Sequence, residues 1–206
     1  MIRVAEAAWL LELGSSAAVV RAHRALLATP RAGLRELVPG AGTLLVVLDD
    51  DTGDDDDVRA LLERSEAEAR AERAAQAEFA SRVHEVAVRY DGEDLADVAR
   101  HAGLSVDEVI ARHTAAEYRV AFVGFQPGFA YLAGLPRELH VPRRATPRPR
   151  VPQGSVAIGG EWTGIYPSPT PGGWHILGST DVGLFDPTAE PPALLQPGDR
   201  VRFVAR

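Results

Sequence analysis

The stretch from Phe122 to Trp174 places glycines and prolines between aromatic and β-branched residues, and this pattern narrows the possible folds. Such runs form short strands joined by loops of fixed backbone conformation. After Tyr118 the chain stays strand-rich to its end, where a Pro-Gly-Asp turn precedes an alternating strand over residues 200–204. We therefore expect residues 82–206 to form a closed or nearly closed antiparallel β-barrel with a helical insertion.

Two short helices are expected in that insertion. The first spans residues 94–100 and stops at Gly103. Ser105 and Glu108 have the spacing of a capping box, which predicts a second helix that contains His113. His113 lies on the apolar side of this helix, so a core role and a catalytic role are both open at this point.

The first part of the chain alternates strands and helices. Strands are predicted over residues 9–13, 33–38, 43–48 and 83–88, and helices over residues 15–30 and 58–79. The order β-α-β-β-α-β is that of a ferredoxin-like fold. We therefore predict an α+β protein, with a ferredoxin-like domain over residues 1–81 and a β-barrel domain over residues 82–206.

Seven aspartates lie between Asp49 and Asp57. A calcium-binding loop needs a glycine at its sixth position and a glutamate at its twelfth. Counted from Asp49, a glycine falls at the fifth position and Ala60 at the twelfth, so the pattern fails. We expect a solvated acidic loop that leads into a helix.

Composition excludes several kinds of chemistry. Cysteine is absent and all 22 basic residues are arginines, so disulfides, thiolates, a P-loop lysine and a Schiff-base lysine are ruled out. The net charge of −7 argues against nucleic-acid binding. No apolar run approaches the roughly 18 residues of a membrane span, and Glu6 and Glu12 exclude a signal peptide. A cytoplasmic protein without membrane contact is expected.

Familiar catalytic motifs do not occur. Gly154 and Ser155 lack the spacing of the Gly-x-Ser-x-Gly nucleophile elbow. There is no His-Glu-x-x-His, and the six histidines are scattered, so no metal site is predicted. By its own residues the chain does not look like a self-sufficient enzyme.

Residues 142–152, which we call the arginine arm, combine four arginines with four prolines. Proline fixes φ and favours an extended conformation in the residue before it. The guanidinium groups would therefore project from a stiff segment that can hold a small anion or a partner's carboxylates. A solvated basic loop at the end of the barrel is the alternative.

Several spaced motifs carry a resemblance to a known family. They are Gly124-Phe-Gln-Pro-Gly-Phe-Ala-Tyr-Leu132, Pro142-Arg-Arg144, Val151-Pro-Gln-Gly-Ser-Val156, Tyr166-Pro167, Pro171-Gly-Gly-Trp174 and Pro197-Gly-Asp199. The chain resembles the PxpB/KipI family, also called allophanate hydrolase subunit 1, which is the first half of the carboxyltransferase domain of urea carboxylase. The resemblance implies a small N-terminal domain followed by a cyclophilin-like β-barrel.

The resemblance further implies the B subunit of an ATP-dependent 5-oxoprolinase. This B subunit would pair with a homologous C subunit, and an A subunit would complete the conversion of 5-oxoproline, a lactam, to glutamate. ATP, with magnesium and bound in the complex, would activate the lactam carbonyl by phosphoryl transfer before hydrolysis opens the ring.

The resemblance also implies roles for individual residues. Arg144 and Arg148 would bind the substrate carboxylate or a phosphoryl oxygen, and His113, Tyr131 and Tyr166 would form hydrogen bonds or transfer protons. Close backbone approach to the ligand is expected at four glycines, namely Gly128, Gly154, Gly172 and Gly173. Phe125, Phe129 and Trp174 are expected to pack the barrel. One departure is Gly178-Ser179-Thr180, where the family commonly has Gly-Arg-Thr.

Two other functions fit the same resemblance. One is a regulatory protein that inhibits a sensor histidine kinase by binding it. The other is a carboxyltransferase or allophanate-hydrolase type of protein that acts on urea-like amides with a biotin carrier.

Overall fold

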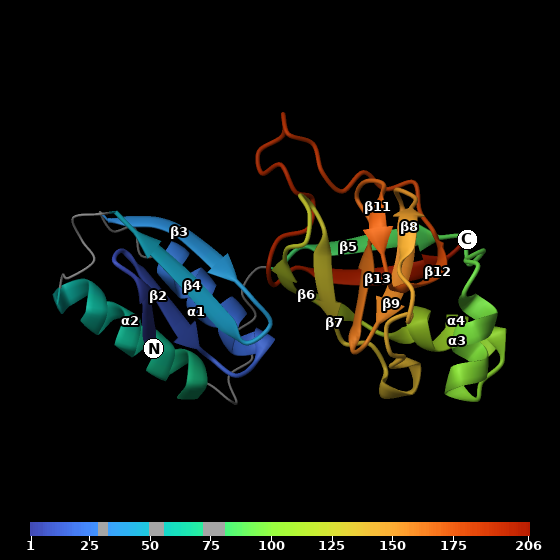
Figure 1. Cartoon of the computed structure of the whole chain (residues 1–206), viewed down its shortest axis with the longest axis horizontal. Coiled ribbons are helices and arrows are strands. Elements are labelled where there is room, and N and C mark those ends of the chain that lie inside the picture. The colour runs from blue at the N-terminus through green and yellow to red at the C-terminus, as the bar shows by residue number, and fades with distance from the viewer. Residues whose placement is uncertain (29–32, 50–55, 72–80) are drawn as a thin grey trace. The chain divides into compact units, whose positions relative to one another are not determined.

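The computed structural model describes residues 1–28, 33–49, 56–71 and 81–206 (Figure 1). The chain divides into two compact units, Met1–Phe79 and Ala80–Arg206, and each is described by itself. Within the described residues, no helix is long and apolar enough to cross a membrane.

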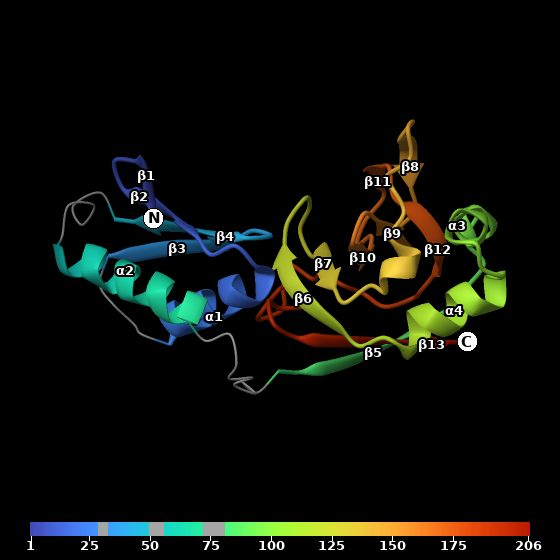
Figure 2. The same ribbon diagram turned by 90° about the horizontal axis from the view of Figure 1, so that it is seen from below.

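The N-terminal unit is a four-stranded antiparallel sheet with two helices. Its strand order is β1-β2-β4-β3, with strands β1 (Ile2–Ala5), β2 (Ala8–Glu12), β3 (Leu34–Pro39) and β4 (Thr43–Leu48). Helices α1 (Ser16–Leu27) and α2 (Asp56–Ala71) lie on one face of the sheet (Figure 2). Buried leucines of β2 and β4 pack against α1 to form the core of this unit.

The ferredoxin-like prediction is wrong in one respect. The predicted strand over residues 83–88 forms, but it pairs with a strand of the C-terminal unit. The sheet edge beside β2 is occupied instead by β1, which was not predicted. Every residue of β1 is exposed, so this strand lacks the alternation of apolar and polar residues that reveals strands in a sequence.

The C-terminal unit is built on a seven-stranded sheet of order β12-β9-β10-β7-β6-β13-β5. Its strands are β5 (Val83–Val88), β6 (Tyr118–Val123), β7 (Ala130–Ala133), β9 (Ser155–Gly159), β10 (Trp162–Ile165), β12 (His175–Ser179) and β13 (Arg200–Ala205). The two edges meet where the backbones of Arg89 and Ser179 exchange hydrogen bonds of 2.9 and 2.8 Å. The sheet is therefore a nearly closed barrel. It is not wholly antiparallel as predicted, because β13 and β5 run parallel.

Alternate residues of the barrel strands face opposite sides of the wall. Val156 and Ile158 of β9 belong to the barrel core, whereas Ala157 between them packs in a second cluster. In the same way, Leu132 of β7 faces the core and Tyr131 packs against the second cluster. The wall of the barrel is therefore apolar on both faces in this region.

The second cluster is mainly aromatic. We call it the aromatic cluster, and its rings belong to Phe122, Phe125, Phe129, Tyr131, Trp162, Tyr166 and Trp174. A two-stranded sheet of β8 (Arg148–Val151) and β11 (Thr170–Gly172) adjoins it through Val151. The arginine arm therefore runs beside this outer face of the barrel.

The helical insertion forms as predicted. Helix α3 (Leu95–Ala102) ends at Gly103, whose φ of 68° gives the left-handed cap. Helix α4 (Val106–Ala115) begins with the predicted capping box of Ser105 and Glu108. A short 3₁₀ helix, η1 (Arg137–Leu139), follows β7. Most of the Asp49–Asp57 run and the end of the predicted helix over residues 58–79 lie outside the described residues.

Candidate functional site

A buried carboxylate fixes the arginine arm to the barrel. Asp94 is 2% exposed, and its Oδ1 accepts hydrogen bonds from Arg144 Nη1 at 2.6 Å and Arg148 Nη2 at 2.8 Å. Its Oδ2 accepts from the backbone N–H of Ile176 at 2.7 Å. Arg148 also contacts Glu93 through Nε at 2.7 Å. These bonds join the arm to the start of α3 and to β12.

The charges in this group balance one another. Burial alone would raise the pKa of Asp94, but hydrogen bonds from Arg148 and from the Ile176 N–H, with the charges of Arg148 and Arg144, hold it below its ordinary value. The Asp94 hydrogen bond raises the pKa of Arg148 in return. Arg144 and Arg148, which we predicted to bind substrate, are thus already engaged within the chain.

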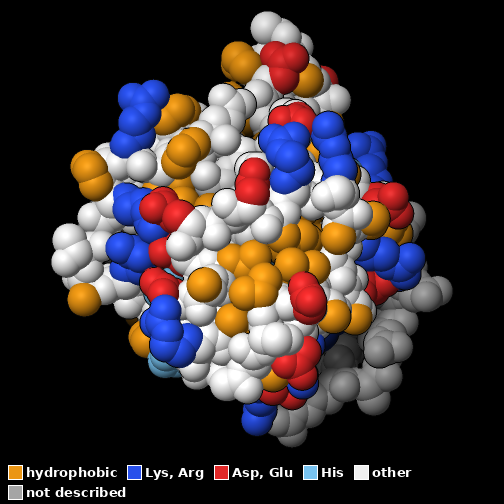
Figure 3. All heavy atoms as spheres, turned by 90° about the vertical axis from the view of Figure 1, so that its right-hand side faces the viewer, with side chains coloured by type: hydrophobic (Ala, Val, Ile, Leu, Met, Phe, Trp, Pro, Cys, Tyr) orange, Lys and Arg blue, Asp and Glu red, His pale blue; other side chains and the backbone are white. Residues whose placement is uncertain are grey.

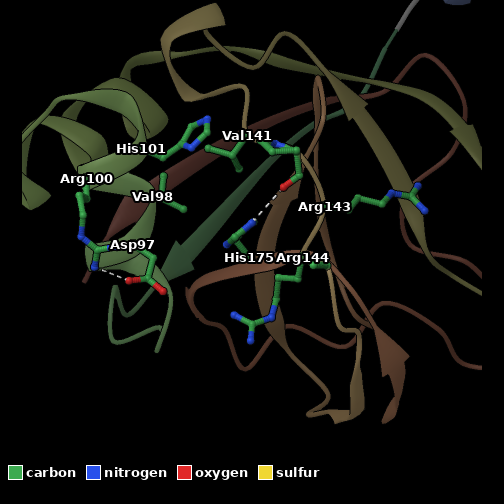
Figure 4. Close-up of a pocket in the computed structure, with 10 residues that line it drawn as sticks. Asp97, Val98, Arg100, His101, Val141, Arg143, Arg144 and His175 are labelled. Carbon is green, nitrogen blue, oxygen red and sulfur yellow. Dashed lines mark hydrogen bonds and ion pairs between the residues drawn. The ribbon is translucent and has the colours of Figure 1, made fainter.

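The side chain of Arg143 is placed differently from those of Arg144 and Arg148. Its guanidinium carbon is 6.0 Å from the centre of the Trp174 ring, and Figure 4 shows the side chain turned away from Arg144 and His175. Within the described part of the chain, Arg143 takes part in none of the ion pairs that hold Arg144 and Arg148. It is an exposed cation of the arm, and it lies beside the aromatic cluster.

Tyr131 and Tyr166, both predicted site residues, meet in the aromatic cluster. Each packs against Phe129, with ring centres 5.1 and 5.2 Å away. Burial raises the pKa of Tyr166, although a backbone hydrogen bond from Trp174 and the charges of Arg143 and Arg148 oppose the rise. Tyr166 is therefore neutral at physiological pH and suited to hydrogen bonding rather than to acting as a base.

The loop before β7 presents an exposed ring at the edge of the cluster. Phe125 has a φ of 70°, which is rare for a bulky side chain, and 60% of it is exposed. Reciprocal hydrogen bonds between Gln126 and Ser168, at 3.4 and 3.0 Å, hold this loop to the segment after Tyr166. Backbone strain of this kind gathers at functional sites more often than elsewhere.

An open cleft of about 570 Å³ lies between α3 and the segment of residues 141–145, and Arg143 is among the residues that line it. Figure 4 shows Asp97, Arg100 and His101 on α3, with His175 and Arg144 across from them. Asp97 and Arg100 pair at 2.6 Å, and His175 Nε2 donates to the Pro142 carbonyl at 3.0 Å. Tyr131 and Tyr166 do not line this cleft.

Figure 3 shows arginine and acidic side chains interspersed around a central apolar area on one face of the C-terminal unit. Cations and anions alternate there, so this face carries no extended basic surface. On this face, recognition of a ligand would therefore depend on local features such as the cleft beside α3.

His113 is remote from the aromatic cluster and from the cleft beside α3. It is fully buried, its Nδ1 lies 2.7 Å from the Tyr90 hydroxyl, and its Nε2 lies 3.1 Å from Thr163 Oγ1. Thr163 donates its own proton to the Ala157 carbonyl, so His113 Nε2–H is the donor to Thr163 and the Tyr90 hydroxyl donates to Nδ1. This geometry favours the core role that the sequence left open over proton transfer to a substrate.

Burial of His113 predicts a pH dependence of stability. Desolvation lowers the pKa of His113 from 6.5 to about 3. Below pH 6.5, His113 therefore binds a proton in the unfolded chain but stays neutral in the folded chain. The free energy of unfolding falls as a result, by up to about 1.4 kcal/mol per pH unit. Denaturant unfolding between about pH 7 and pH 4 measures this slope, which His113→Asn should reduce and His101→Asn, at an exposed position, should not. Imidazole NMR resonances of His113 that titrate near pH 6.5 would contradict the prediction.

The glycines predicted to approach a ligand have structural reasons to be glycine. A Cβ at Gly128, Gly154 or Gly172 would collide with atoms of another segment, and at Gly172 that atom is the Tyr166 hydroxyl oxygen. At Gly173 the nearest atoms are 3.8 Å away, so space remains. These packing constraints need no ligand, and close approach to one stays a prediction.

Two residues of this region could not be singled out from the sequence. Asp94 looked only like the first residue of a helix, because its arginine partners lie 50 and 54 residues further along the chain. Arg143 was not separated from the other arginines of the arm, since only the fold shows which of them are paired. No spacing rule applied to the sequence reveals that Asp94 is paired with these arginines or that Arg143 is not.

The fold and the arm define a β-barrel protein with an aromatic cluster on the outer face of its wall. A family model described as "Carboxyltransferase domain, subdomain C and D" matches residues 2–195. The chain belongs to this family, which confirms the resemblance found in the sequence.

Curated relatives agree with this assignment. Proteins named as the B subunit of 5-oxoprolinase, from Escherichia coli O157:H7, Haemophilus influenzae and Bacillus subtilis, are 57%, 50% and 47% identical over 60%, 62% and 65% of this chain. The matches cover 58%, 61% and 57% of those proteins. The chain thus spans about three fifths of the length of the relatives it matches.

Solved structures share the fold. TTHA0988 superimposes with a TM-score of 0.81 at 40% identity, over 97% of this chain and 39% of that one. PH0987 from Pyrococcus horikoshii gives 0.59 at 37% identity, over 99% and 96% of the two chains. The Kluyveromyces lactis urea carboxylase gives 0.63 at 17% identity, over 93% of this chain and 20% of that one, a likeness of fold alone.

Proposed function

We propose that this chain acts as the B subunit of an ATP-dependent 5-oxoprolinase and works with the A and C subunits to cleave 5-oxoproline to glutamate. The observation that carries the proposal is the identity of 47–57% to three relatives named as the B subunit of that enzyme. Because the matches cover only about three fifths of those relatives, the chemistry is argued from the site of this chain.

The reaction requires activation because amide resonance protects a lactam from water. Phosphoryl transfer from ATP to the lactam carbonyl oxygen would make the carbonyl carbon more electrophilic. Hydrogen-bond donors positioned around that oxygen would stabilise the charge that develops on it. This chain can supply phenol hydroxyls, at Tyr131 and Tyr166, and a cation, at Arg143. Their part in the reaction would be to bind and orient the lactam on an aromatic surface that excludes water.

The donors in the described part of the chain do not form a magnesium site. Among the residues that the structure describes, no three histidine or acidic side chains gather as metal ligands. The chain also has no lysine for a phosphate loop. ATP with Mg²⁺ would be bound in the assembled complex, and no step of the reaction is assigned through them to residues of this chain.

A reconstitution experiment tests the proposal. We expect 5-oxoproline-dependent ATP hydrolysis when this chain is combined with its A and C subunits, and loss of that activity when any one of the three is left out. The matched control omits 5-oxoproline while retaining all three proteins. Folded proteins that together show no 5-oxoproline-dependent hydrolysis would overturn the proposal and favour kinase regulation or a urea-like amide as substrate.

A further inference from the structure

We propose that Arg143, with the aromatic cluster, forms a binding site for a small carboxylic acid that has a flat, uncharged body. Identifying the natural ligand as 5-oxoproline rests on the proposed function, but the site itself does not. In this site Arg143 binds the carboxylate, and Tyr131, the half-buried ring beside the buried Trp174, contacts the flat body of the ligand.

The balance of charges singles out Arg143. Arg144 and Arg148 share the buried carboxylate of Asp94, and Arg148 also contacts Glu93. An incoming anion would have to compete with these acids for their guanidinium groups. Arg143 is exposed and forms no such ion pair with any described residue. Its planar guanidinium can therefore donate hydrogen bonds to a carboxylate without first losing an ion pair within the chain.

The guanidinium group of Arg143 lies beside rings of the aromatic cluster. Its guanidinium carbon lies 6.0 Å from the Trp174 ring, and that ring is 5.5 Å from Tyr131. The charge of Arg143 acts on Tyr166 as well. Trp174 and Tyr166 are 4% and 2% exposed, so a carboxylate on Arg143 would place its attached ring against the half-buried Tyr131 at the surface of the cluster.

The backbone on both sides of the site is fixed before any ligand binds. Pro142 precedes Arg143 and its carbonyl accepts from His175 at 3.0 Å. The N–H of Arg144 donates to the Gly173 carbonyl at 2.8 Å, next to Trp174. Preorganisation of this kind reduces the conformational entropy lost on binding.

A pair of ligands and a pair of variants test the site on the full chain. The ligands are 5-oxoproline and 2-pyrrolidinone, which has the same lactam ring without the carboxylate. The variants are Arg143→Gln and Arg150→Gln, because Arg150 is an exposed arginine of the same arm. Binding is followed by calorimetry and by tryptophan fluorescence, since the Trp174 ring lies 6.0 Å from the Arg143 guanidinium.

We expect wild type and Arg150→Gln to bind 5-oxoproline at least about 10-fold more tightly than 2-pyrrolidinone, the loss typical of one charge-assisted hydrogen bond. In Arg143→Gln that preference should disappear while thermal stability is unchanged. No binding of 5-oxoproline to wild type, or an equal loss in both variants, would overturn the proposal. Retained preference in Arg143→Gln would also overturn it.

Kinetics in the three-protein complex separate this inference from the proposed function. Arg143→Gln should raise KM for 5-oxoproline about 10-fold or more and leave kcat within about 2-fold, because the lost contact is already present in the ground state. If wild type lacks activity but binds the acid through Arg143, the proposed function fails and the site stands. If wild type is active and Arg143→Gln has unchanged KM, the site fails and the function stands. If an acidic peptide binds at Arg143 and the small acid does not, this surface is a docking surface for a partner protein, and the small-molecule site is overturned.

Discussion

Replacement of Asp94 by alanine is expected to destabilise the C-terminal unit by about 3 kcal/mol or more. The substitution leaves Arg144 and Arg148 without their shared carboxylate and leaves the N–H of Ile176 without its acceptor. Because Asp94 is 2% exposed, water does not readily replace it. Denaturant unfolding of the variant, compared with the wild-type chain, measures the loss.

Asp97→Ala is the matched control for Asp94→Ala. Asp97 lies three residues away on α3 and, among the described residues, pairs only with Arg100, at a side-chain exposure of 49%. Exposed pairs of this kind contribute less than about 1 kcal/mol. Equal effects at the two positions would show that the Asp94 group does not hold the arm. Asp94→Asn, which keeps an acceptor for Ile176 but removes the charge, should fall between the two.

Phe129→Ala is expected to cost about 3–5 kcal/mol, the range for removing a buried aromatic ring. Phe129 is 1% exposed and packs edge-on against four rings, those of Phe125, Tyr131, Tyr166 and Trp174. Its loss would leave a cavity at the centre of the aromatic cluster. The near-ultraviolet circular dichroism of the cluster should weaken together with the fall in unfolding free energy.

Phe125→Ala provides the comparison within the same cluster. The side chain is 60% exposed, so its truncation removes little buried area and should cost less than about 1 kcal/mol. Relief of its left-handed backbone conformation does not follow, because alanine is also disfavoured there. A larger loss for Phe125→Ala than for Phe129→Ala would contradict the placement of these two rings.

The local elements of the fold were predictable because they depend on neighbours in the sequence. The capping box of Ser105 and Glu108, the stop at Gly103 and the strand Thr43–Leu48 all form where the pattern indicated. The pairing of β5 was not predictable in this way. Alternation shows that Val86 and Val88 are buried, but it does not show which sheet buries them.

The candidate site was predictable in part. The sequence indicated a stiff arginine arm and placed Tyr131 and Tyr166 among the site residues, and the structure brings these tyrosines together near the arm. The sequence could not show that Arg144 and Arg148 are paired with Asp94, because this ion pairing joins segments that lie far apart in the chain. The same limit applies to His113, whose partners Tyr90 and Thr163 come from separate segments of the barrel.

The pairing of β5 with β13 has a consequence for how this unit is made in the cell. Strand β5 opens the C-terminal unit and β13 ends it, and the two lie side by side over residues 83–88 and 200–205. The ribosome must therefore release residues 200–205 before β5 finds its neighbour, so the barrel cannot close while the residues between these strands are being synthesised. Contacts this distant in sequence slow folding. Until they form, the unpaired edge of β5 is a surface at which a chaperone could act and at which nascent chains could aggregate.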